Sequence, residues 1–176
     1  VSSGATMITH LFNAMSQLTN REPGLVGAAL DAGELSAGLI ADGFHVDPDS
    51  IRIALRAKQD SGHIFLVSDA MATIGTDISE FFLNGRRILR CDGRLTLEDG
   101  TLAGADLDLL TAVLFMAQTI GLDFEEAIRM ATLYPAKILQ RESELGNLDK
   151  GTRADFIWLR EKTRIGGVWR QGISAL

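Results

Sequence analysis

Three segments of the sequence each contain a short apolar run that is followed by polar residues. They are Thr6-Met7-Ile8-Thr9-His10-Leu11-Phe12-Asn13-Ala14-Met15, Leu39-Ile40-Ala41-Asp42-Gly43-Phe44-His45 and Ile64-Phe65-Leu66-Val67-Ser68-Asp69-Ala70. Continuous apolar runs of this length are typical of strands buried on both faces of a parallel sheet. Each run is followed by a titratable side chain, and α/β barrels carry their chemistry at the carboxyl ends of their strands. The three segments therefore predict parallel strands with a candidate site where they end.

The segments between these runs predict helices that return the chain to the start of the sheet. Strands are expected at residues 5–12, 36–41 and 63–68, and a short helix at residues 24–30. Asp47 is expected to cap a second helix, with Pro48 in its first turn, that ends near Gln59. A strand-loop-helix order repeated three times favours crossover connections in a parallel sheet.

The pattern changes after Asp69. Asn84-Gly85 lies between two β-favouring runs, which is a strong hairpin signal, and we expect an insert at about residues 75–100 that overhangs the site. Helices are expected at residues 106–120, ended by Gly121, and from Asp123 to a break at Tyr134-Pro135. A further short helix is expected at residues 136–140, and strands at residues 154–159 and 164–170.

The composition restricts the classes of partner. The 176 residues are 46% hydrophobic, enough for one sizeable core, and 17 basic against 23 acidic residues give a net charge of −6. Since no basic run could follow a nucleic-acid backbone, nucleic acid is not an expected partner. The sequence shows no signal peptide and no apolar run long enough for a membrane span. The single cysteine, Cys91, cannot form an internal disulfide, which favours a reducing, cytoplasmic compartment.

A family resemblance is carried by a series of motifs in order along the chain. They are THLFNAM, REPG, ADGFHVD, LVSDA, GTLAGAD, MATLYPAK and LGNLDKGTRADF. In these motifs the chain resembles the N-acetylglucosamine-6-phosphate deacetylases of the amidohydrolase superfamily. The resemblance covers only the later part of such an enzyme, and the chain begins with Val1, so we expect a C-terminal portion.

The resemblance implies an α/β fold taken from a (β/α)8 TIM barrel. Residues 1–142 would form its last three β/α units, with the hairpin insert at about 75–100. Residues 143–176 would supply closing strands of a small β-sandwich that the N-terminal part of the enzyme begins.

The implied activity is metal-dependent hydrolysis of N-acetylglucosamine 6-phosphate to glucosamine 6-phosphate and acetate. His10 corresponds to a ligand of a divalent metal, most simply zinc, whose other ligands, a glutamate and a second histidine, would precede Val1. Asp69 corresponds to the catalytic carboxylate that takes a proton from the activated water and hands it to the leaving amine. The intact enzyme is expected to be a homodimer.

The resemblance also implies a set of substrate contacts. The implied residues are Asn13, Ala14, Arg21, Asp42, His45, Leu102, Ala103 and Gly104. Arg21, Asn13 and the backbone at Ala14 would bind the sugar phosphate, for which the planar guanidinium is suited. On position alone Arg21 would be a solvated surface residue and His10 a buried core histidine.

Two other functions are compatible with the residues. One is another metal-dependent amidohydrolase or deaminase that acts on a different amide or ring. The other is a non-catalytic fragment that binds sugar phosphates. His63, Trp158 and the pair Glu125-Glu126 are assigned no role in catalysis.

Overall fold

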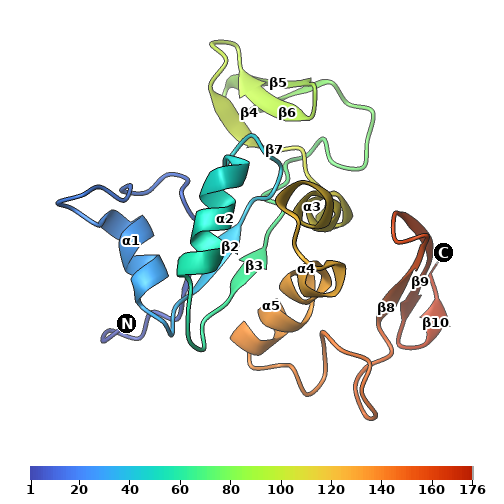
Figure 1. The fold of residues 1–176 in the computed structure, drawn as a ribbon. Helices are drawn as coiled ribbons and strands as arrows, with labels where there is room; N and C mark the ends of the chain where they lie inside the picture. Colours follow the sequence, from blue (N-terminus) through green and yellow to red (C-terminus); the bar gives the residue numbers. More distant parts are fainter. Residues whose placement is uncertain (176) are drawn as a thin grey trace.

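The computed structural model describes residues 1–175, which form three separate sheets and a layer of helices (Figure 1). The first sheet is parallel and has the order β1 (Met7–Ile8), β2 (Ser36–Leu39), β3 (Ile64–Leu66). Helix α1 (Gly24–Asp31) connects β1 to β2, and α2 (Pro48–Ala57) connects β2 to β3. The three predicted parallel strands and their crossover helices are confirmed, although each strand is shorter than expected.

Helix α2 begins as its sequence predicts. The Asp47 carboxylate accepts a hydrogen bond from the Asp49 amide at 2.8 Å, and Pro48 occupies the first turn. The helix ends at Ala57, close to the end expected near Gln59. The ammonium group of the next residue, Lys58, donates to carbonyl groups at the end of α1, those of Ala29, Ala32 and Gly33. Lys58 therefore joins the two crossover helices, and it satisfies carbonyls that α1 leaves without helical partners.

The insert is an antiparallel sheet of four strands. Its order is β4 (Glu80–Leu83), β5 (Arg86–Cys91), β6 (Arg94–Leu97), β7 (Leu102–Ala105). The predicted turn at Asn84-Gly85 is confirmed, and both residues have positive φ, 51° and 75°. Strand β7 was not predicted, because its small residues give no strand pattern. It connects the insert to the first sheet through a parallel bridge between Ala70 and Ala105.

The helices that follow differ from expectation at two places. Helix α3 (Leu109–Phe115) continues as a π-helical segment, η1 (Met116–Ile120), and Gly121 ends it with φ 82°. Asp123 caps α4 (Phe124–Ala131) as predicted. The break expected at Pro135 is wrong, since the chain breaks at Thr132 and Pro135 lies in the first turn of α5 (Leu133–Ile138). A proline is tolerated there because its missing amide would have no helical acceptor.

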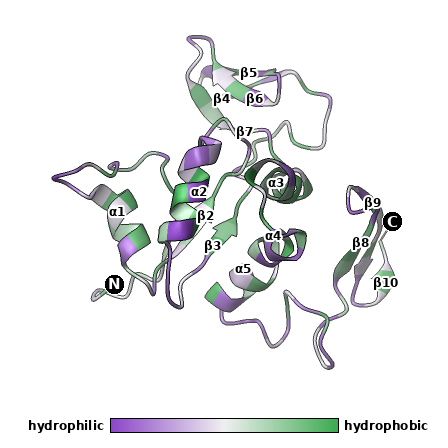
Figure 2. Cartoon of the chain, viewed as in Figure 1, coloured by the Kyte–Doolittle hydropathy of each residue, from purple (hydrophilic) through white to green (hydrophobic). Residues whose placement is uncertain are grey.

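The C-terminal sheet stands apart from this body (Figure 1). It is antiparallel, with the order β10 (Ile173–Ser174), β9 (Arg164–Arg170), β8 (Phe156–Arg160). The hydrophobic core lies elsewhere, and its buried members run from Leu11 to Met130. Figure 2 shows the apolar character of β3 and α3 within it. The structure is thus mixed α/β, and within residues 1–175 its three parallel strands do not close a barrel.

A membrane span is absent from the described chain. None of the helices within residues 1–175 combines the length and the apolar character that crossing a bilayer requires.

Candidate functional site

The carboxyl ends of β1, β2 and β3 bring four of the predicted residues to one end of the parallel sheet. His10 follows β1, Asp42 and His45 follow β2, and Asp69 follows β3. The ladder continues past the strands, because the Leu11 amide donates to the Gly38 carbonyl at 2.7 Å and the Val67 amide to the Leu39 carbonyl at 3.0 Å. We call His10, Asp42, His45 and Asp69 the strand-end cluster.

The backbone of this cluster is strained at two of its members. His10 has φ 29° and Asp69 has φ 48°, in the left-handed region that side chains other than glycine rarely adopt. Such residues cost on the order of 1–3 kcal/mol each and persist only where the surrounding structure fixes them. At Asp69 the fixing contact is visible, since its carbonyl accepts a hydrogen bond from the Ala105 amide at 3.1 Å.

His10 carries an unsatisfied polar atom. Its Nδ1 is buried and has no hydrogen-bond partner within residues 1–175. Buried polar atoms nearly always have partners, so a buried ring nitrogen without one, at the end of a strand, indicates that a bound metal or ligand supplies the missing partner. The described residues hold no group of three or more His, Cys, Asp or Glu side chains suited to a metal ion. His10 thus fits one ligand position, and a metal there would need further ligands from outside this part of the chain.

Asp42 and His45 form a buried pair. The Asp42 Oδ2 lies 2.6 Å from the His45 Nδ1, and the two side chains are only 6% and 8% exposed. The other carboxylate oxygen accepts from the amides of Phe44 and His45 at 2.8 and 2.9 Å. Burial by itself raises the pKa of Asp42, but the hydrogen bonds from the His45 ring and from the two amides outweigh it, and the pKa lies below its ordinary value. The ionised Asp42 carboxylate therefore orients the His45 imidazole through Nδ1, and the Nε2 of His45 is left for a ligand.

The insert contacts the turn that carries this pair. The Arg94 guanidinium, next to the β5–β6 turn, lies over the Phe44 ring with 4.9 Å between the guanidinium carbon and the ring centroid. Gly43 in the same turn has φ 76°, and a Cβ added there would lie 3.0 Å from the Phe115 ring. The contact between Arg94 and Phe44 was not predicted. The sequence predicted only that the insert would lie over the site, and this prediction did not identify the residues that make the contact.

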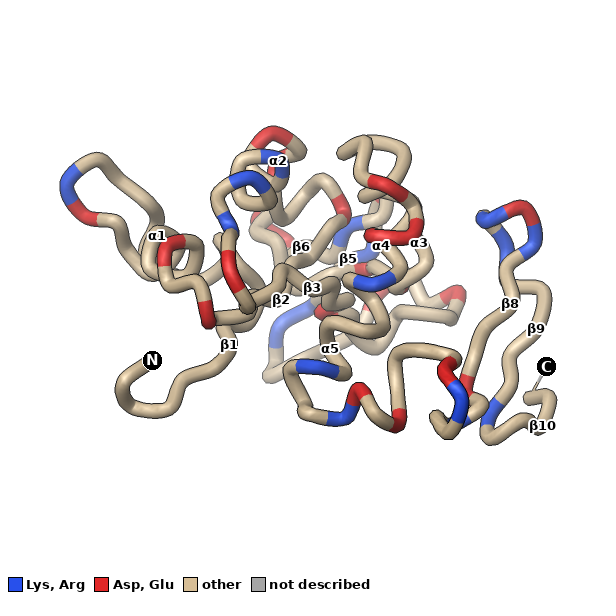
Figure 3. Tube along the Cα trace, turned by 60° about the horizontal axis from the view of Figure 1, so that its bottom comes forward, with Lys and Arg blue, Asp and Glu red and all other residues tan. Residues whose placement is uncertain are grey.

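The other predicted substrate contacts are only partly brought to the cluster. The Asn13 side-chain amide donates to the Leu11 carbonyl at 3.2 Å, and Ala14, next in the loop, is exposed with φ 50°. Arg21 is exposed in a turn closed by hydrogen bonds between Thr19 and Glu22. Figure 3 shows that the loop between β1 and α1, to which this turn belongs, projects outward. The structure does not bring Arg21 to the strand-end cluster.

Strand β7 lies beside Asp69. Its residues Leu102, Ala103 and Gly104 include the predicted backbone stretch, and Gly104 has φ 116°. A Cβ at Gly104 would lie 2.6 Å from the Met71 side chain and 3.8 Å from the Asp69 carbonyl oxygen. Glycine is therefore needed for β7 to approach the loop that carries Asp69.

Comparison with known proteins places these features in a family. Residues 3–173 match the amidohydrolase family. The chain is 41% identical to the N-acetylgalactosamine-6-phosphate deacetylase of Shewanella sp. (strain ANA-3) and 37% identical to the N-acetylglucosamine-6-phosphate deacetylase of Bos taurus, in each case over 98% of this chain and 43% of the relative.

A solved structure gives the same result. The crystal structure of N-acetylglucosamine-6-phosphate deacetylase from Pasteurella multocida superposes with a TM-score of 0.93 at 34% identity, over 98% of this chain and 45% of that one. The chain thus spans less than half the length of these relatives and corresponds to their C-terminal portion. Both the sequence match and the superposition extend over nearly every described residue, and on that basis the chain belongs to the amidohydrolase family.

Proposed function

We propose that this chain is the C-terminal part of a metal-dependent deacetylase that hydrolyses N-acetylglucosamine 6-phosphate to glucosamine 6-phosphate and acetate. The observation that carries the proposal is the strand-end cluster, which gathers His10, the Asp42–His45 pair and Asp69 within a chain similar to such deacetylases over 98% of its length. Residues 1–142 would complete a barrel and residues 143–176 a small sandwich with the preceding part of the protein.

Metal chemistry is assigned to His10. Amidohydrolases generally use a divalent metal, and the orphaned ring nitrogen of His10 supports a ligand role for this residue. When bound, the ion, proposed to be zinc, polarises the amide carbonyl and lowers the pKa of water. The remaining ligands come from the preceding part of the protein.

Asp69 is assigned the proton transfers. Its side chain belongs to an exposed residue at the end of β3, and its backbone is held by β7. In the proposed reaction the Asp69 carboxylate takes a proton from the attacking water and delivers it to the nitrogen of the leaving amine. A carboxylate can serve in both directions when its pKa lies between those of the two partners.

Substrate recognition is assigned to the remaining residues. His45, oriented by Asp42, contacts the sugar phosphate, and Asp42 acts through His45 because both of its oxygens are already used. The phosphate is assigned to Asn13, to the backbone at Ala14 and to Arg21, whose exposed loop would have to approach the strand-end cluster to reach it. Residues 102–104 line the pocket. Because one relative is named for the galacto sugar and the other for the gluco sugar, the two C4 epimers are the substrates to compare.

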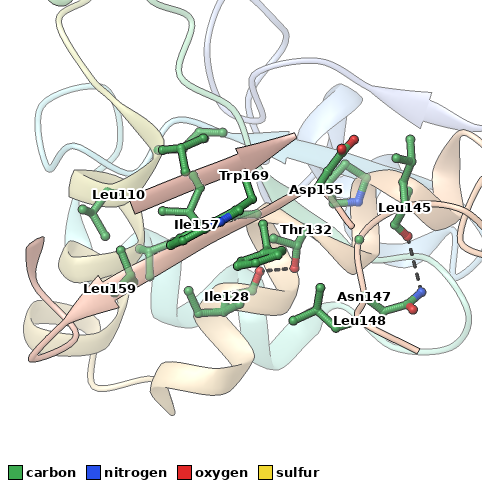
Figure 4. A pocket seen from close by; sticks show the side chains of 18 of the residues that line it. Leu110, Ile128, Thr132, Leu145, Asn147, Leu148, Asp155, Ile157, Leu159 and Trp169 are labelled. Carbon is green, nitrogen blue, oxygen red and sulfur yellow. Dashed lines mark hydrogen bonds between the residues drawn. The ribbon is translucent and has the colours of Figure 1, made fainter. Parts of the chain in front are cut away.

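An apolar cleft supports the proposal that another part of the protein packs against this chain. It lies between α3–α5 and the C-terminal sheet, has a volume of about 850 Å³, and is lined by side chains such as Leu110, Ile128, Ile157 and Trp169 (Figure 4). A lining this apolar is expected to be covered in a stable protein. In the proposal it is covered by the preceding part of the chain, in an enzyme that is a cytoplasmic homodimer.

The test compares the isolated chain with the same chain joined to the N-terminal part that its relatives have, referred to below as the full-length enzyme. Acetate release from N-acetylglucosamine 6-phosphate is measured with zinc supplied. We expect activity and tight zinc binding only in the full-length enzyme, since His10 alone holds zinc weakly. Binding of glucosamine 6-phosphate without turnover would favour a non-catalytic module, and turnover of another amide or ring would favour a different amidohydrolase. An active, monodisperse isolated chain would contradict the proposal.

A further inference from the structure

Arg90 is a side chain of the insert that reaches out to the main body. Its Nε donates to the Asp106 carboxylate at 2.6 Å, and its Nη1 donates to the Thr76 carbonyl at 2.6 Å and more weakly to the Thr73 carbonyl at 3.4 Å. The three acceptors belong to two different segments, the loop that follows Asp69 and the residue that follows β7. One guanidinium therefore joins β5, β7 and the loop after Asp69.

The environment of Arg90 distinguishes it from a surface ion pair. The Asp106 side chain is 5% exposed and that of Arg90 is 29% exposed. Thr73 is fully buried, and its hydroxyl lies 3.5 Å from the second Asp106 oxygen. Arg87 on the same strand provides the contrast, because it pairs with Glu80 and Glu98 inside the insert and is 41% exposed.

The contacts of Arg90 converge on Asp69. Asp106 directly follows Ala105, whose amide donates to the Asp69 carbonyl at 3.1 Å and whose carbonyl accepts from the Met71 amide at 3.3 Å. Thr73 lies four residues after Asp69, in the loop that these two hydrogen bonds join to Ala105. Arg90 thus closes a ring of contacts around the segment that starts at Asp69, whose φ of 48° requires the surrounding structure to hold it.

We propose that Arg90 is a positioning residue for Asp69. Arg90 acts on Asp69 through Asp106 and through the loop at residues 70–76. We call the contacts of Arg90 with Asp106, Thr73 and Thr76 the clamp. The effect of the clamp on catalysis rests on the proposed function, whereas the existence of the clamp does not depend on that function. The insert then has a purpose beyond covering the site, because it fixes the direction of the carboxylate that transfers protons. A displacement of about 1 Å at such a group can lower the rate by a factor of roughly one hundred.

The structural half of the proposal is tested by amide hydrogen exchange on the full-length enzyme. Arg90→Gln should speed exchange at least tenfold in peptides that cover residues 69–76 and 104–106, whereas Arg87→Gln, its matched control on the same strand, should leave those peptides unchanged. Arg90→Lys keeps a charge opposite Asp106 but loses the planar fork, so it should give an intermediate effect and is the variant to use if Arg90→Gln does not fold. Equal exchange in wild type and both Arg90 variants would overturn the clamp.

The catalytic half is tested by steady-state kinetics on the same proteins. Arg90→Gln should lower kcat for acetate release about ten- to a hundredfold with KM within about threefold of wild type, since the change affects Asp69 and not the phosphate contacts. Arg87→Gln should stay within about threefold in both constants. A kcat loss matched by Arg87→Gln, or a loss confined to KM, would overturn the positioning role. If wild type itself releases no acetate, the proposed function fails, and the exchange measurement still decides whether the clamp exists.

Discussion

Replacing Asp42 with asparagine isolates one interaction of the strand-end cluster. In Asp42→Asn the remaining side-chain oxygen can still accept from the amides of Phe44 and His45, so the turn keeps both backbone hydrogen bonds. The new side-chain nitrogen would then face the His45 Nδ1, which must become an acceptor. The variant therefore removes the charged partner of His45 and reverses the tautomer of its ring, with almost no change in volume.

The expected loss follows from the burial of the pair. A hydrogen bond to a charged group contributes roughly 1.5–3 kcal/mol to stability and one between neutral groups roughly 0.5–1.5 kcal/mol. Both side chains are more than nine-tenths buried, so exchanging the charged bond for the neutral one should cost about 1–1.5 kcal/mol at neutral pH. The effect on function should be larger. Because partners that orient a functional histidine typically matter ten- to a hundredfold, kcat/KM for the sugar phosphate should fall by about that factor.

The pH dependence gives the sign that identifies the cause. The pKa of Asp42 is lower in the folded protein than the value of about 3.9 in unfolded chains, so its stabilisation is complete above that value and is lost as the pH falls through the folded pKa. Chemical unfolding of the full-length enzyme should separate wild type and Asp42→Asn at pH 7, and the separation should shrink below about pH 4. Asp47→Asn is the control, because asparagine keeps the cap of α2 and because the hydrogen bond of the Asp47 carboxylate within residues 1–175 comes from the Asp49 amide and not from a histidine. A constant separation at all pH values would refute the reasoning.

Three further predictions concern the full-length enzyme. Asp69→Asn should lower kcat at least a hundredfold while sugar-phosphate binding persists in calorimetry, and turnover within about tenfold of wild type would remove its assigned role. Arg21→Ala should raise KM for the phosphorylated sugar far more than for N-acetylglucosamine, and equal effects would show that Arg21 does not bind phosphate. His63 stacks on Tyr134, and burial, reinforced by Lys137, lowers its pKa, so stability should fall as the pH drops below about 6.5. Unfolding midpoints at pH 7.5 and 5.5 should differ less in His63→Phe, and an unchanged difference would exclude His63 as the cause.

Elements with a local chemical signal were predictable from the sequence. Asp47 and Asp123 cap their helices, Gly121 ends η1, and Asn84-Gly85 turns the β4–β5 hairpin, each because the residue satisfies a local geometric need. The strand ends were predictable for a related reason. A buried apolar run must stop where its polar residues begin, and this reasoning placed Asp69 just after its strand and His10 near the end of its own, although the expected first strand, residues 5–12, extended past His10.

Features that depend on distant partners were not predictable. Strand β7 forms because β6 supplies its hydrogen bonds, and nothing in Leu102–Ala105 alone requires a strand. The link from Lys58 to the end of α1 and the link from Arg90 to Asp106 join residues far apart in sequence, and surface charges of these types would fit the local pattern equally well. The prediction at Pro135 is wrong because a proline can either end one helix or lie in the first turn of the next. Here the non-helical backbone of Thr132 separates α4 from α5, so that Pro135 lies in the first turn of α5.

The distribution of burial connects the proposed incompleteness of the chain to its chemistry. Among described residues after 142, only Gly167 is buried, and apolar side chains of the C-terminal sheet, such as Ile157 and Ile173, are 56% and 73% exposed. The strained backbone at His10 and Asp69 requires a rigid surrounding, whereas a sheet without a buried face supplies little rigidity. A preceding part of the protein would thus serve catalysis in two ways: it would bring the missing metal ligands, and by covering the apolar cleft it would hold the helices against which the strand-end cluster is built.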